Sequence, residues 1–260
     1  MHPTGNTILI TGGTSGIGRG LAEHFHHRGN QVIIAGRRQS LLHEITAAHP
    51  GMRGMQLDLE DSRAVDAFAA EIREQFPELN VLINNAGISK PEDLTAGSGD
   101  ISVSRSIIDV NIVGVLHLTA ALLPTLRQQP TATIITTSSG LAFVPLAGFP
   151  TYCATKSFLH SWVQSLRFQL RGTSVEVLEL IPPYVQTELA GLSQASDPNA
   201  MPLDDYIAQV VRILDAPAPS HGEIVVRRVT ALRWAEKLAY RRVFAMLNRV
   251  RSPWIGHGGT

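Results

Sequence analysis

A tyrosine and a lysine, Tyr152 and Lys156, stand four positions apart in a stretch of helical periodicity. Residues at this spacing share one face of a helix, so the two side chains are expected one turn apart. A free phenol has a pKa of about 10, which is too high for ready proton exchange near neutrality. A nearby ammonium favours the phenolate and lowers that pKa, which would make the tyrosine a general acid and base. Alone the pair is a weak signal, because chance produces it often and leaves both residues on the surface.

A serine, Ser139, follows a strand-like run at residues 133–136 through a short polar turn. Ligands of open parallel sheets bind outside the carboxyl ends of the strands. A hydroxyl at this place can therefore orient a carbonyl oxygen and stabilise the charge that develops on it. Two alternatives stay open, namely that Ser138 has this role or that the serine only forms the turn.

The sequence TGGTSGIG, at residues 11–18, joins the first strand-like run to an amphipathic helical pattern. A phosphate approaches backbone closely where Cβ atoms are absent, and the amides of a helix N-terminus donate to it. We assign the turn to Gly12, the close approach to Gly16 and helix packing to Gly18. The spacing differs from G-x-G-x-x-G, but a strand before and a helix after are the context of a dinucleotide site.

The second strand-like run ends in Ala-Gly-Arg37-Arg38, without an acid. An acid at this place accepts a hydrogen bond from the ribose 2′-hydroxyl of NAD, whereas a cation binds the 2′-phosphate of NADP. Arg37 and Arg38 therefore predict NADP(H), with NAD(H) as the alternative cofactor and two solvated surface arginines as the structural alternative. Asp58, after the third strand, fits a contact to the adenine amino group or a cap of the next helix.

Short β-branched runs alternate with longer stretches of helical period. Several runs are apolar throughout, which is typical of strands buried on both faces. This order predicts an α/β fold with one doubly wound parallel sheet, the Rossmann fold, over residues 1–230. Asp61 or Ser62 is expected to cap the third helix. The expected strands are residues 7–10, 31–35, 55–57, 81–83, 133–136, 175–180 and 222–226, and the two long helices are residues 104–128 and 152–171.

The composition of the chain limits the other classes of protein to which it could belong. A formal net charge of zero gives no general attraction to nucleic acid. Cys153, the single cysteine, cannot form an intramolecular disulfide. The N-terminus lacks the features of a secretory signal and no apolar run is expected to span a bilayer, which favours the cytoplasm. His24, His26 and His27 lack a metal-ligand spacing, so no metal site is expected.

In combination, these motifs resemble the short-chain dehydrogenase/reductase family over about residues 5–230. The thirteen-residue step from Ser139 to Tyr152 is also the one usual in the family. Each motif is weak alone, but the ordered set is specific. The matching motifs are TGGTSGIG at residues 11–18, LD at 57–58, NNAG at 84–87, Asn111 within DVN, Ser139, and YCATK at 152–156.

The resemblance implies roles for particular residues. Tyr152 would donate the proton in reduction and accept it in oxidation, Lys156 would lower its pKa and hold the nicotinamide ribose, and Ser139 would fix the substrate oxygen. Asn111 would hold a water in a proton relay. The implied cofactor-binding residues are Gly12, Thr14, Ser15, Gly16, Ile17, Gly18, Arg37, Arg38, Asp58, Leu59, Asn85, Ala86, Gly87, Tyr152, Lys156, Val185 and Thr187.

Two segments depart from the family pattern. After the sixth strand the chain has Pro182-Pro183 where the family has Pro-Gly, and Pro183 removes a donor and fixes φ. This variant resembles a bacterial subgroup named after the DltE oxidoreductase, a name that gives no substrate. Residues 188–206 are expected to form a mobile lid over the substrate.

The second departure is the C-terminal extension, residues 231–260. The segment from Arg227 to Arg251 contains eight Lys or Arg residues and one acidic residue. One basic amphipathic helix is expected there, either on a membrane surface or, as we prefer, packed over the substrate cleft or a neighbouring subunit. Its apolar stripe is Leu232, Ala235, Leu238, Ala239, Met246 and Leu247, and its basic residues are Arg233, Lys237, Arg241, Arg242 and Arg249.

The expected function is that of an NADP(H)-dependent oxidoreductase that transfers a hydride between the nicotinamide and a ketone, an aldehyde or a secondary alcohol. The resemblance further implies a small-molecule substrate and a homodimer or homotetramer. The alternatives are a catalytically silent NADP(H)-binding sensor or scaffold and a peripheral membrane protein. The substrate itself has no readable code in the sequence.

Overall fold

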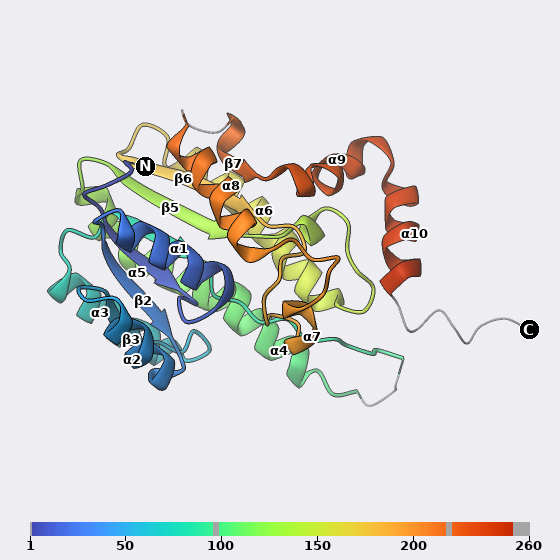
Figure 1. Cartoon of the computed structure of the whole chain (residues 1–260), viewed down its shortest axis with the longest axis horizontal. Coiled ribbons are helices and arrows are strands. Elements are labelled where there is room, and N and C mark those ends of the chain that lie inside the picture. Colours follow the sequence, from blue (N-terminus) through green and yellow to red (C-terminus); the bar gives the residue numbers. More distant parts are fainter. Residues whose placement is uncertain (1, 96–98, 217–219, 252–260) are drawn as a thin grey trace, which may run out of the picture.

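Parallel strands form the centre of the molecule, which is seen here as a computed structural model that describes residues 2–95, 99–216 and 220–251. The side chains at positions 220, 236–238 and 249–251 lie outside this described part. Within it seven parallel strands pair in the order β3-β2-β1-β4-β5-β6-β7 (Figure 1). They are β1 (Thr7–Thr11), β2 (Gln31–Gly36), β3 (Arg53–Gln56), β4 (Val81–Asn84), β5 (Ala132–Thr137), β6 (Val175–Ile181) and β7 (Glu223–Val225).

Apolar residues on alternate sides of the strands build a core on each face of the sheet. In β1, Ile8 and Ile10 belong to one cluster and Leu9 to the other, and all three are buried. This alternation follows from the two-residue period of a strand. A strand that must be apolar on both sides has the run of aliphatic residues from which a doubly wound sheet was predicted.

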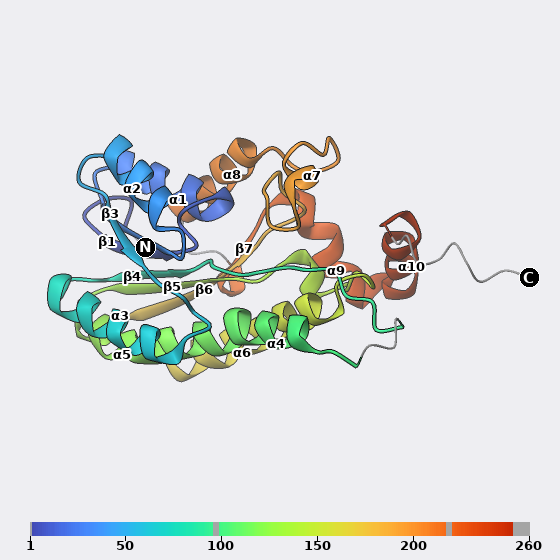
Figure 2. The ribbon, with the colours of Figure 1, turned by 90° about the horizontal axis from the view of Figure 1, so that it is seen from below.

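Helices cover both faces of the sheet in two layers (Figure 2). One layer holds α1 (Gly16–His27), α2 (Gln39–Ala48) and α8 (Leu203–Asp215). The opposite layer holds α3 (Ser62–Gln75), α4 (Ser102–Ile108), α5 (Gly114–Gln128) and α6 (Pro150–Gln169). Shorter elements are the π-helical turn η1 (Asp109–Val113), the 3-10 turns η2 (Gly140–Ala142), η3 (Ser220–Gly222) and η4 (Arg227–Val229), and helices α7 (Leu192–Ala195), α9 (Thr230–Leu238) and α10 (Tyr240–Arg251).

The strand order reverses between β1 and β4, so the chain leaves them toward opposite sides of the sheet. The diverging connections open a crevice at the carboxyl ends of these strands, where ligands of this architecture bind. The predicted Rossmann fold is therefore confirmed. The glycine-rich turn after β1 and the residues after β2, β4 and β5 all meet at this edge.

Three local expectations needed correction. Strand β3 is Arg53–Gln56 rather than residues 55–57, so Asp58 follows it in a loop. The expected helix at 104–128 contains the wider turn η1, which separates α4 from α5. The expected single C-terminal helix is two helices, because Ala239 leaves helical geometry with φ −158° and ψ 31°.

The segment Ser102–Gln128 also corrects the expectation that no helix is long and apolar enough to cross a membrane, since its mean hydropathy reaches 1.8 over an 18-residue window. In the fold its residues Leu118, Leu122 and Leu126 are buried in the core between α3 and the sheet. This position explains the apolar composition as that of a core helix.

Gly114, the first residue of α5, lies where the helix passes closest to the loop after β3. A Cβ at this position would lie 2.4 Å from the carbonyl oxygen of Leu59, and backbone cannot move aside as a flexible side chain does. We therefore expect Gly114→Ala to lower the free energy of unfolding by about 1–3 kcal/mol, measured by urea denaturation. Gly172→Ala, where the Cβ has free space but φ is +80°, should cost less; equal losses would contradict the steric explanation.

Candidate active site

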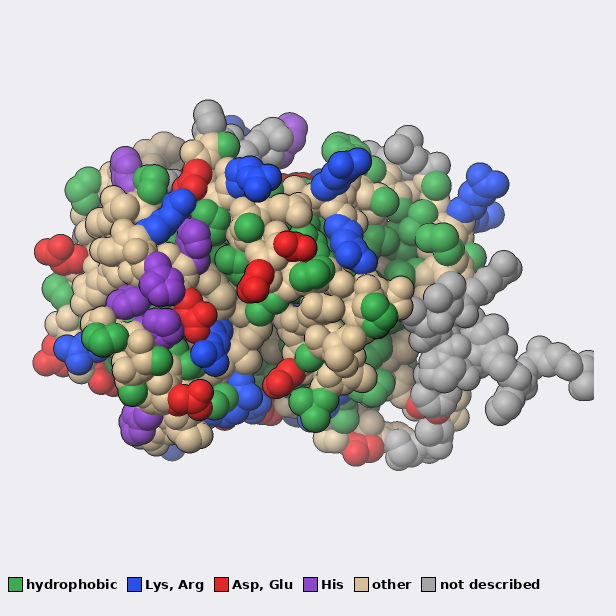
Figure 3. All heavy atoms as spheres, in the orientation of Figure 1, with side chains coloured by type: hydrophobic (Ala, Val, Ile, Leu, Met, Phe, Trp, Pro, Cys, Tyr) green, Lys and Arg blue, Asp and Glu red, His purple; other side chains and the backbone are tan. Residues whose placement is uncertain are grey.

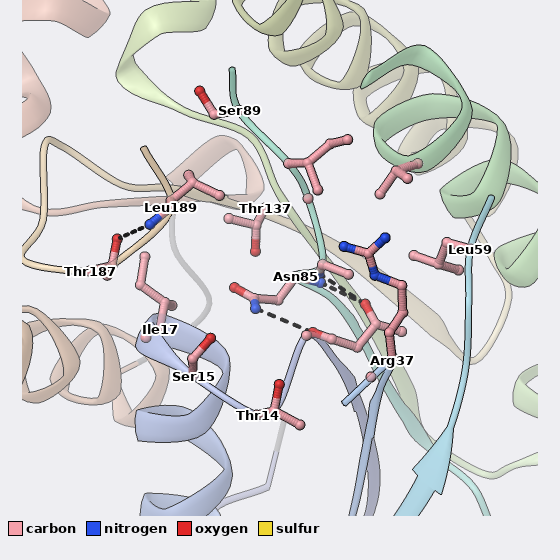
Figure 4. A pocket seen from close by; sticks show the side chains of 18 of the residues that line it. Thr14, Ser15, Ile17, Arg37, Leu59, Asn85, Ser89, Thr137, Thr187 and Leu189 are labelled. Atoms are coloured by element: carbon pink, nitrogen blue, oxygen red, sulfur yellow. Dashed lines mark hydrogen bonds between the residues drawn. The ribbon is translucent and has the colours of Figure 1, made fainter. Parts of the chain in front are cut away.

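A cleft of about 460 Å³ opens at the carboxyl edge of the sheet (Figure 4). Most of the predicted site residues meet there, although they come from segments far apart in the chain. Gly18, Asn111, Ser139 and Val185 lie outside the immediate lining. The predicted residues that line the cleft are Thr14, Ser15, Gly12, Gly16, Ile17, Arg37, Arg38, Asp58, Leu59, Asn85, Ala86, Gly87, Tyr152, Lys156 and Thr187.

The glycine-rich turn is closed by contacts that leave no room for side chains. Gly12 has a φ of +67°, and a Cβ on it would lie 2.9 Å from the Cα of Ala86. A Cβ on Gly18 would lie 2.3 Å from the carbonyl oxygen of Gly12. Gly12 thus has the conformation expected of the turn residue, and Gly18 brings α1 against it.

The segment after β4 is fastened to the end of β1. The Thr11 hydroxyl accepts hydrogen bonds from the backbone amides of Asn85 and Ala86, each at 3.1 Å. The side-chain amide of Asn85 donates to the carbonyl of Thr11 at 3.2 Å. The NNAG motif therefore joins the two strands that flank the crevice, as expected of a segment that supports the central sheet.

The two arginines after β2 have different surroundings. Arg38 donates to the hydroxyls of Thr14 at 3.1 Å and Ser15 at 2.8 Å, so it folds over the glycine-rich turn. The guanidinium of Arg37 points into the cleft (Figure 4). Asp58 does not cap α3, because Asp61 accepts from the amides of Arg63 and Ala64 in that role. Asp58 remains at the cleft, where it binds the amide of Glu60 at 3.1 Å.

Tyr152 lies in the first turn of α6, which Pro150 begins. Proline suits this position because its missing N–H has no helical partner there. Burial raises the pKa of the Tyr152 phenol, and the neighbouring Ser139 hydroxyl opposes that rise. Ser139 also accepts from the amide of Leu141 at 3.1 Å, which fixes its hydroxyl at the start of η2.

Lys156 is buried one turn further along α6. Its Nζ donates to the carbonyl of Thr137 at 2.9 Å and lies 5.7 Å from the centroid of the Tyr152 ring. Burial lowers the pKa of the lysine to about 8. That Lys156 lowers the pKa of Tyr152 stays a prediction; the contribution that opposes burial here comes from Ser139. The ammonium itself is directed to a strand carbonyl.

Asn111 lies in the π-helical turn η1 and is completely buried. Its Oδ1 accepts from the amide of Ile88 at 2.8 Å, and its Nδ2 donates to the carbonyl of Ile88 at 3.0 Å. Nδ2 also donates to the hydroxyl of Thr155, the neighbour of Lys156, at 3.1 Å. Single π-turns inside helices are frequent at functional sites. This π-turn places the side chain of Asn111 between Ile88, which follows Gly87, and Thr155, which precedes Lys156.

The structure distinguishes the two serines after β5. The hydroxyl of Ser138 donates to the buried carboxylate of Glu179 in β6, away from Tyr152. Ser139 is the serine in contact with Tyr152. Glu179 was not among the residues predicted from the sequence, although two glutamates inside the otherwise apolar run of β6 were a visible signal.

The segment after β6 is held by a glutamine that the sequence analysis also missed. Gln194 donates to the carbonyl of Val185 at 2.8 Å and to the hydroxyl of Thr187 at 3.1 Å. Val185 pairs with Met201 in a short parallel bridge, so the expected lid at 188–206 is folded back on this segment. The tyrosine beside Pro183, Tyr184, donates to Asp197 at 3.1 Å.

The histidines expected to bind no metal gather on the side of the molecule where α1 and α2 lie (Figure 3). The rings of His26 and His49 are 5.8 Å apart and those of His27 and His49 are 5.6 Å apart. Burial and then the charges of His49 and His27 lower the pKa of His26. These contacts lie far from the cleft, and the absence of a metal site there stays a prediction.

Comparison with known proteins decides the family. Residues 6–197 match the short chain dehydrogenase family. The chain belongs to this family. It is 41% identical to the uncharacterized oxidoreductase DltE of Bacillus subtilis, over 95% of this chain and 98% of that one.

Two further relatives have named activities or ligands. A serine 3-dehydrogenase of Agrobacterium fabrum is 36% identical over 74% of this chain and 78% of its own length. A closed form of serine dehydrogenase complexed with NADP+ superposes with a TM-score of 0.74 at 27% identity, covering 83% of this chain and 91% of that one. This short chain dehydrogenase is accordingly an oxidoreductase.

The C-terminal helices of this short chain dehydrogenase pack on its own domain. A Cβ on Gly140 would lie 2.6 Å from Val229 and 3.0 Å from Leu232, so α9 and the turn before it rest on η2. Asn248 in α10 binds the carbonyl of Pro145 at 3.1 Å and the amide of Ala147. The helices thus cover the loop that joins Ser139 to α6. The side chains of Lys237, Leu238 and Arg249 lie outside the described residues.

The buried ammonium of Lys156 should lower the free energy of unfolding of the short chain dehydrogenase, because burial of a charge costs free energy. The folded pKa of about 8 lies below the value of an exposed lysine, so folding releases a proton between these two pKa values and stability rises with pH there. We expect Lys156→Met to raise the free energy of unfolding at pH 7 by about 1–3 kcal/mol. The gain should shrink as the pH rises above 8.

Urea denaturation of the cofactor-free protein at pH 7 and pH 9.5 measures this difference. Lys90→Met, at an exposed lysine of the same cleft, is the control and should change little at either pH. A Lys156→Met variant that is less stable than the wild type at pH 7 would contradict the assignment of a desolvation cost to this side chain.

Proposed function

We propose that the protein transfers a hydride between NADP(H) and a ketone, an aldehyde or a secondary alcohol, with Tyr152 as general acid and base. The observation that carries this proposal is that Tyr152 and Lys156 line the same cleft as the glycine-rich turn and Arg37, with Ser139 next to Tyr152. A catalytically silent sensor would not need Tyr152, Lys156 and Ser139, so we prefer the enzyme.

The residues of the cleft fit a dinucleotide. Amides of the glycine-rich turn and the N-terminus of α1 would bind the pyrophosphate, because Gly12 and Gly16 carry no Cβ toward it. Asp58 and Asn85 would contact the adenosine half, and Val185 and Thr187 the nicotinamide amide. When bound, the reduced cofactor supplies the hydride for the carbonyl carbon.

The side chains around the carbonyl oxygen would handle the proton. Tyr152 would donate it in reduction, and Ser139 would hold the same oxygen in the reach of the phenol. The ammonium of Lys156, positioned by Thr137, would face the hydroxyls of the nicotinamide ribose and favour the phenolate after transfer. Asn111 would connect this group to solvent through a water, as the family resemblance implies.

The choice of NADP(H) over NAD(H) rests on the end of β2. Arg38 is already bound to Thr14 and Ser15, whereas Arg37 points into the cleft (Figure 4). No acid stands at this strand end to accept from a ribose 2′-hydroxyl. The NADP+ complex of the related serine dehydrogenase supports the same choice.

We also propose a homodimer or homotetramer in the cytoplasm. Exposed apolar side chains on α4, η1 and α6, namely those of Ile108, Val113, Phe158 and Phe168, support contact with a second copy. A membrane role of the tail is less favoured, because Val243, Phe244 and Leu247 of α10 face the core of their own domain.

Tyr152→Phe removes the proton donor and keeps the ring that fills the site. We expect turnover to fall by at least about 100-fold, since general acid catalysis contributes 10²–10⁴. The NADPH dissociation constant should stay within about twofold, because the phenol hydroxyl is not needed for the pyrophosphate and arginine contacts. A panel of ketones and aldehydes followed by NADPH absorbance measures the rate, with fluorescence titration for binding. Activity equal to the wild type would refute Tyr152 as the acid.

Arg37→Asp places an acid where NADP carries its 2′-phosphate. We expect NADPH affinity to fall by about 10- to 100-fold, the range for a lost charge-assisted bond, while NADH affinity changes little or rises. Dissociation constants of both cofactors measured by fluorescence give the ratio. Arg63→Asp, on the exposed face of α3, is the control, and the same ratio in both variants would remove Arg37 from the phosphate site.

A further inference from the structure

Glu179 is a charged residue in the interior of the sheet. It lies in β6 between Thr136 of β5 and Glu223 of β7, and it is completely buried. Its side chain shares the sheet face of Val177, on which α6 packs. A carboxylate at such a place is costly unless donors surround it.

Two donors reach this carboxylate. The hydroxyl of Ser138 donates to Oε1, and Nδ1 of His160 lies 2.8 Å from Oε2 and 3.1 Å from Oε1. Nε2 of His160 lies 2.8 Å from the side-chain amide of Gln164. With a proton on Nδ1, the imidazole donates to Glu179 and accepts from Gln164, so every one of these contacts is satisfied.

The same stripe of α6 carries the candidate catalytic pair and this histidine. Tyr152, Lys156, His160 and Gln164 follow each other at four-residue intervals, so they lie along one face of the helix. The first two face the cleft and the third binds Glu179. One helix face therefore contacts both the reaction site and the side chain that holds Ser138.

Ser138 precedes Ser139 in a turn that is pinned on both sides. The amide of Ser138 donates to the carbonyl of Leu180 at 2.9 Å, and the amide of Gly140 donates to that of Pro182 at 3.0 Å. These bonds align the turn with β6. The bond between the Ser138 side chain and Glu179 also fixes how the turn is rotated relative to β6. The direction of the Ser139 hydroxyl depends on this rotation.

A second carboxylate, that of Glu223, lies beside Glu179 and His160, so a metal site is an alternative explanation of the cluster. His160, Glu179 and Glu223 have ligand atoms within 4.8 Å of one another, as a metal site would. However, both oxygens of Glu223 bind the guanidinium of Arg233 in α9, at 2.7 and 2.8 Å. Arg233 lies 4.6 Å from the ring of Phe143, which lies 4.7 Å from that of His160. Glu223 is thus already paired with a cation, and we assign no metal.

We propose that Glu179 is a positioning residue: oriented by His160, its carboxylate holds Ser138 and thereby fixes the hydroxyl of Ser139 against Tyr152. This inference rests on the proposed function, in which Ser139 holds the substrate oxygen. It also gives the C-terminal extension a part in the site, because Arg233 and Phe143 enclose the same cluster.

Glu179→Gln tests this role with little change of shape. The Gln amide nitrogen donates where one carboxylate oxygen accepted, so the contacts with Ser138 and His160 are weakened and Ser139 is held less firmly. We expect kcat to fall about tenfold, as for a charge-assisted hydrogen bond of modest net strength, with NADPH affinity unchanged. Because the Ser139 hydroxyl lowers the pKa of Tyr152, its displacement should move the basic limb of the pH profile for reduction to higher pH.

Controls separate positioning from a loss of fold. Ser138→Ala breaks the same bond from its other end, and it replaces Glu179→Gln if that variant does not fold. The double variant should be no slower than the slower single variant, because both substitutions act through the contact between residues 138 and 179. Glu176→Gln, on the same strand, should leave kcat and the pH profile unchanged. Wild-type kcat and profile in Glu179→Gln would overturn the proposal.

A crystal structure of Glu179→Gln gives a readout that needs no turnover. We expect the Ser139 hydroxyl to change its position relative to Tyr152, and an unchanged position would overturn the positioning role whatever the activity. A wild type that binds NADPH but reduces no carbonyl would instead refute the proposed function. The two failures are therefore distinguishable.

Discussion

The buried bond between Lys156 and the carbonyl of Thr137 is the contact on which the site depends. An ammonium without water needs an acceptor, and this one finds it at the end of β5. The bond fixes the position of α6 along the sheet. Tyr152, one helical turn before Lys156, therefore lies at Ser139, and His160, one turn after it, lies at Glu179. The same burial lowers the pKa of Lys156 to about 8, which is the stability cost of holding a cation there.

The two ends of the cleft use opposite means of recognition. Around Gly12 and Gly18 the site consists of backbone, and the lack of Cβ atoms lets strand and helix close on one another. Around Tyr152 the site consists of buried side chains, and burial shifts the pKa values of Tyr152 and Lys156. The C-terminal helices belong to the second end, and part of their excess of basic residues is explained by Arg233, which neutralises Glu223 inside the fold.

Periodicity and motifs predicted the seven strands, their parallel order and the place of the site, because these depend on local spacing and on the rule that ligands bind at carboxyl strand ends. Predictions were less reliable where packing overrides local preference. The break at Ala239 in the tail has no proline or glycine to mark it. The packing of Leu118, Leu122 and Leu126, within the apolar stretch Ser102–Gln128, beneath the sheet is visible only in the folded chain.

The sequence by itself determined the fold class and the family and indicated the residues that we propose exchange a proton, because each rests on residue types at fixed spacing. Tertiary structure decided which of two adjacent serines meets Tyr152. Strand side chains alternate between faces, and only the packing of β6 and α6 shows that Ser138 turns to Glu179, forty-one positions later. A pair so distant in sequence has no local pattern, so the support beneath the candidate active site becomes visible only in the folded chain.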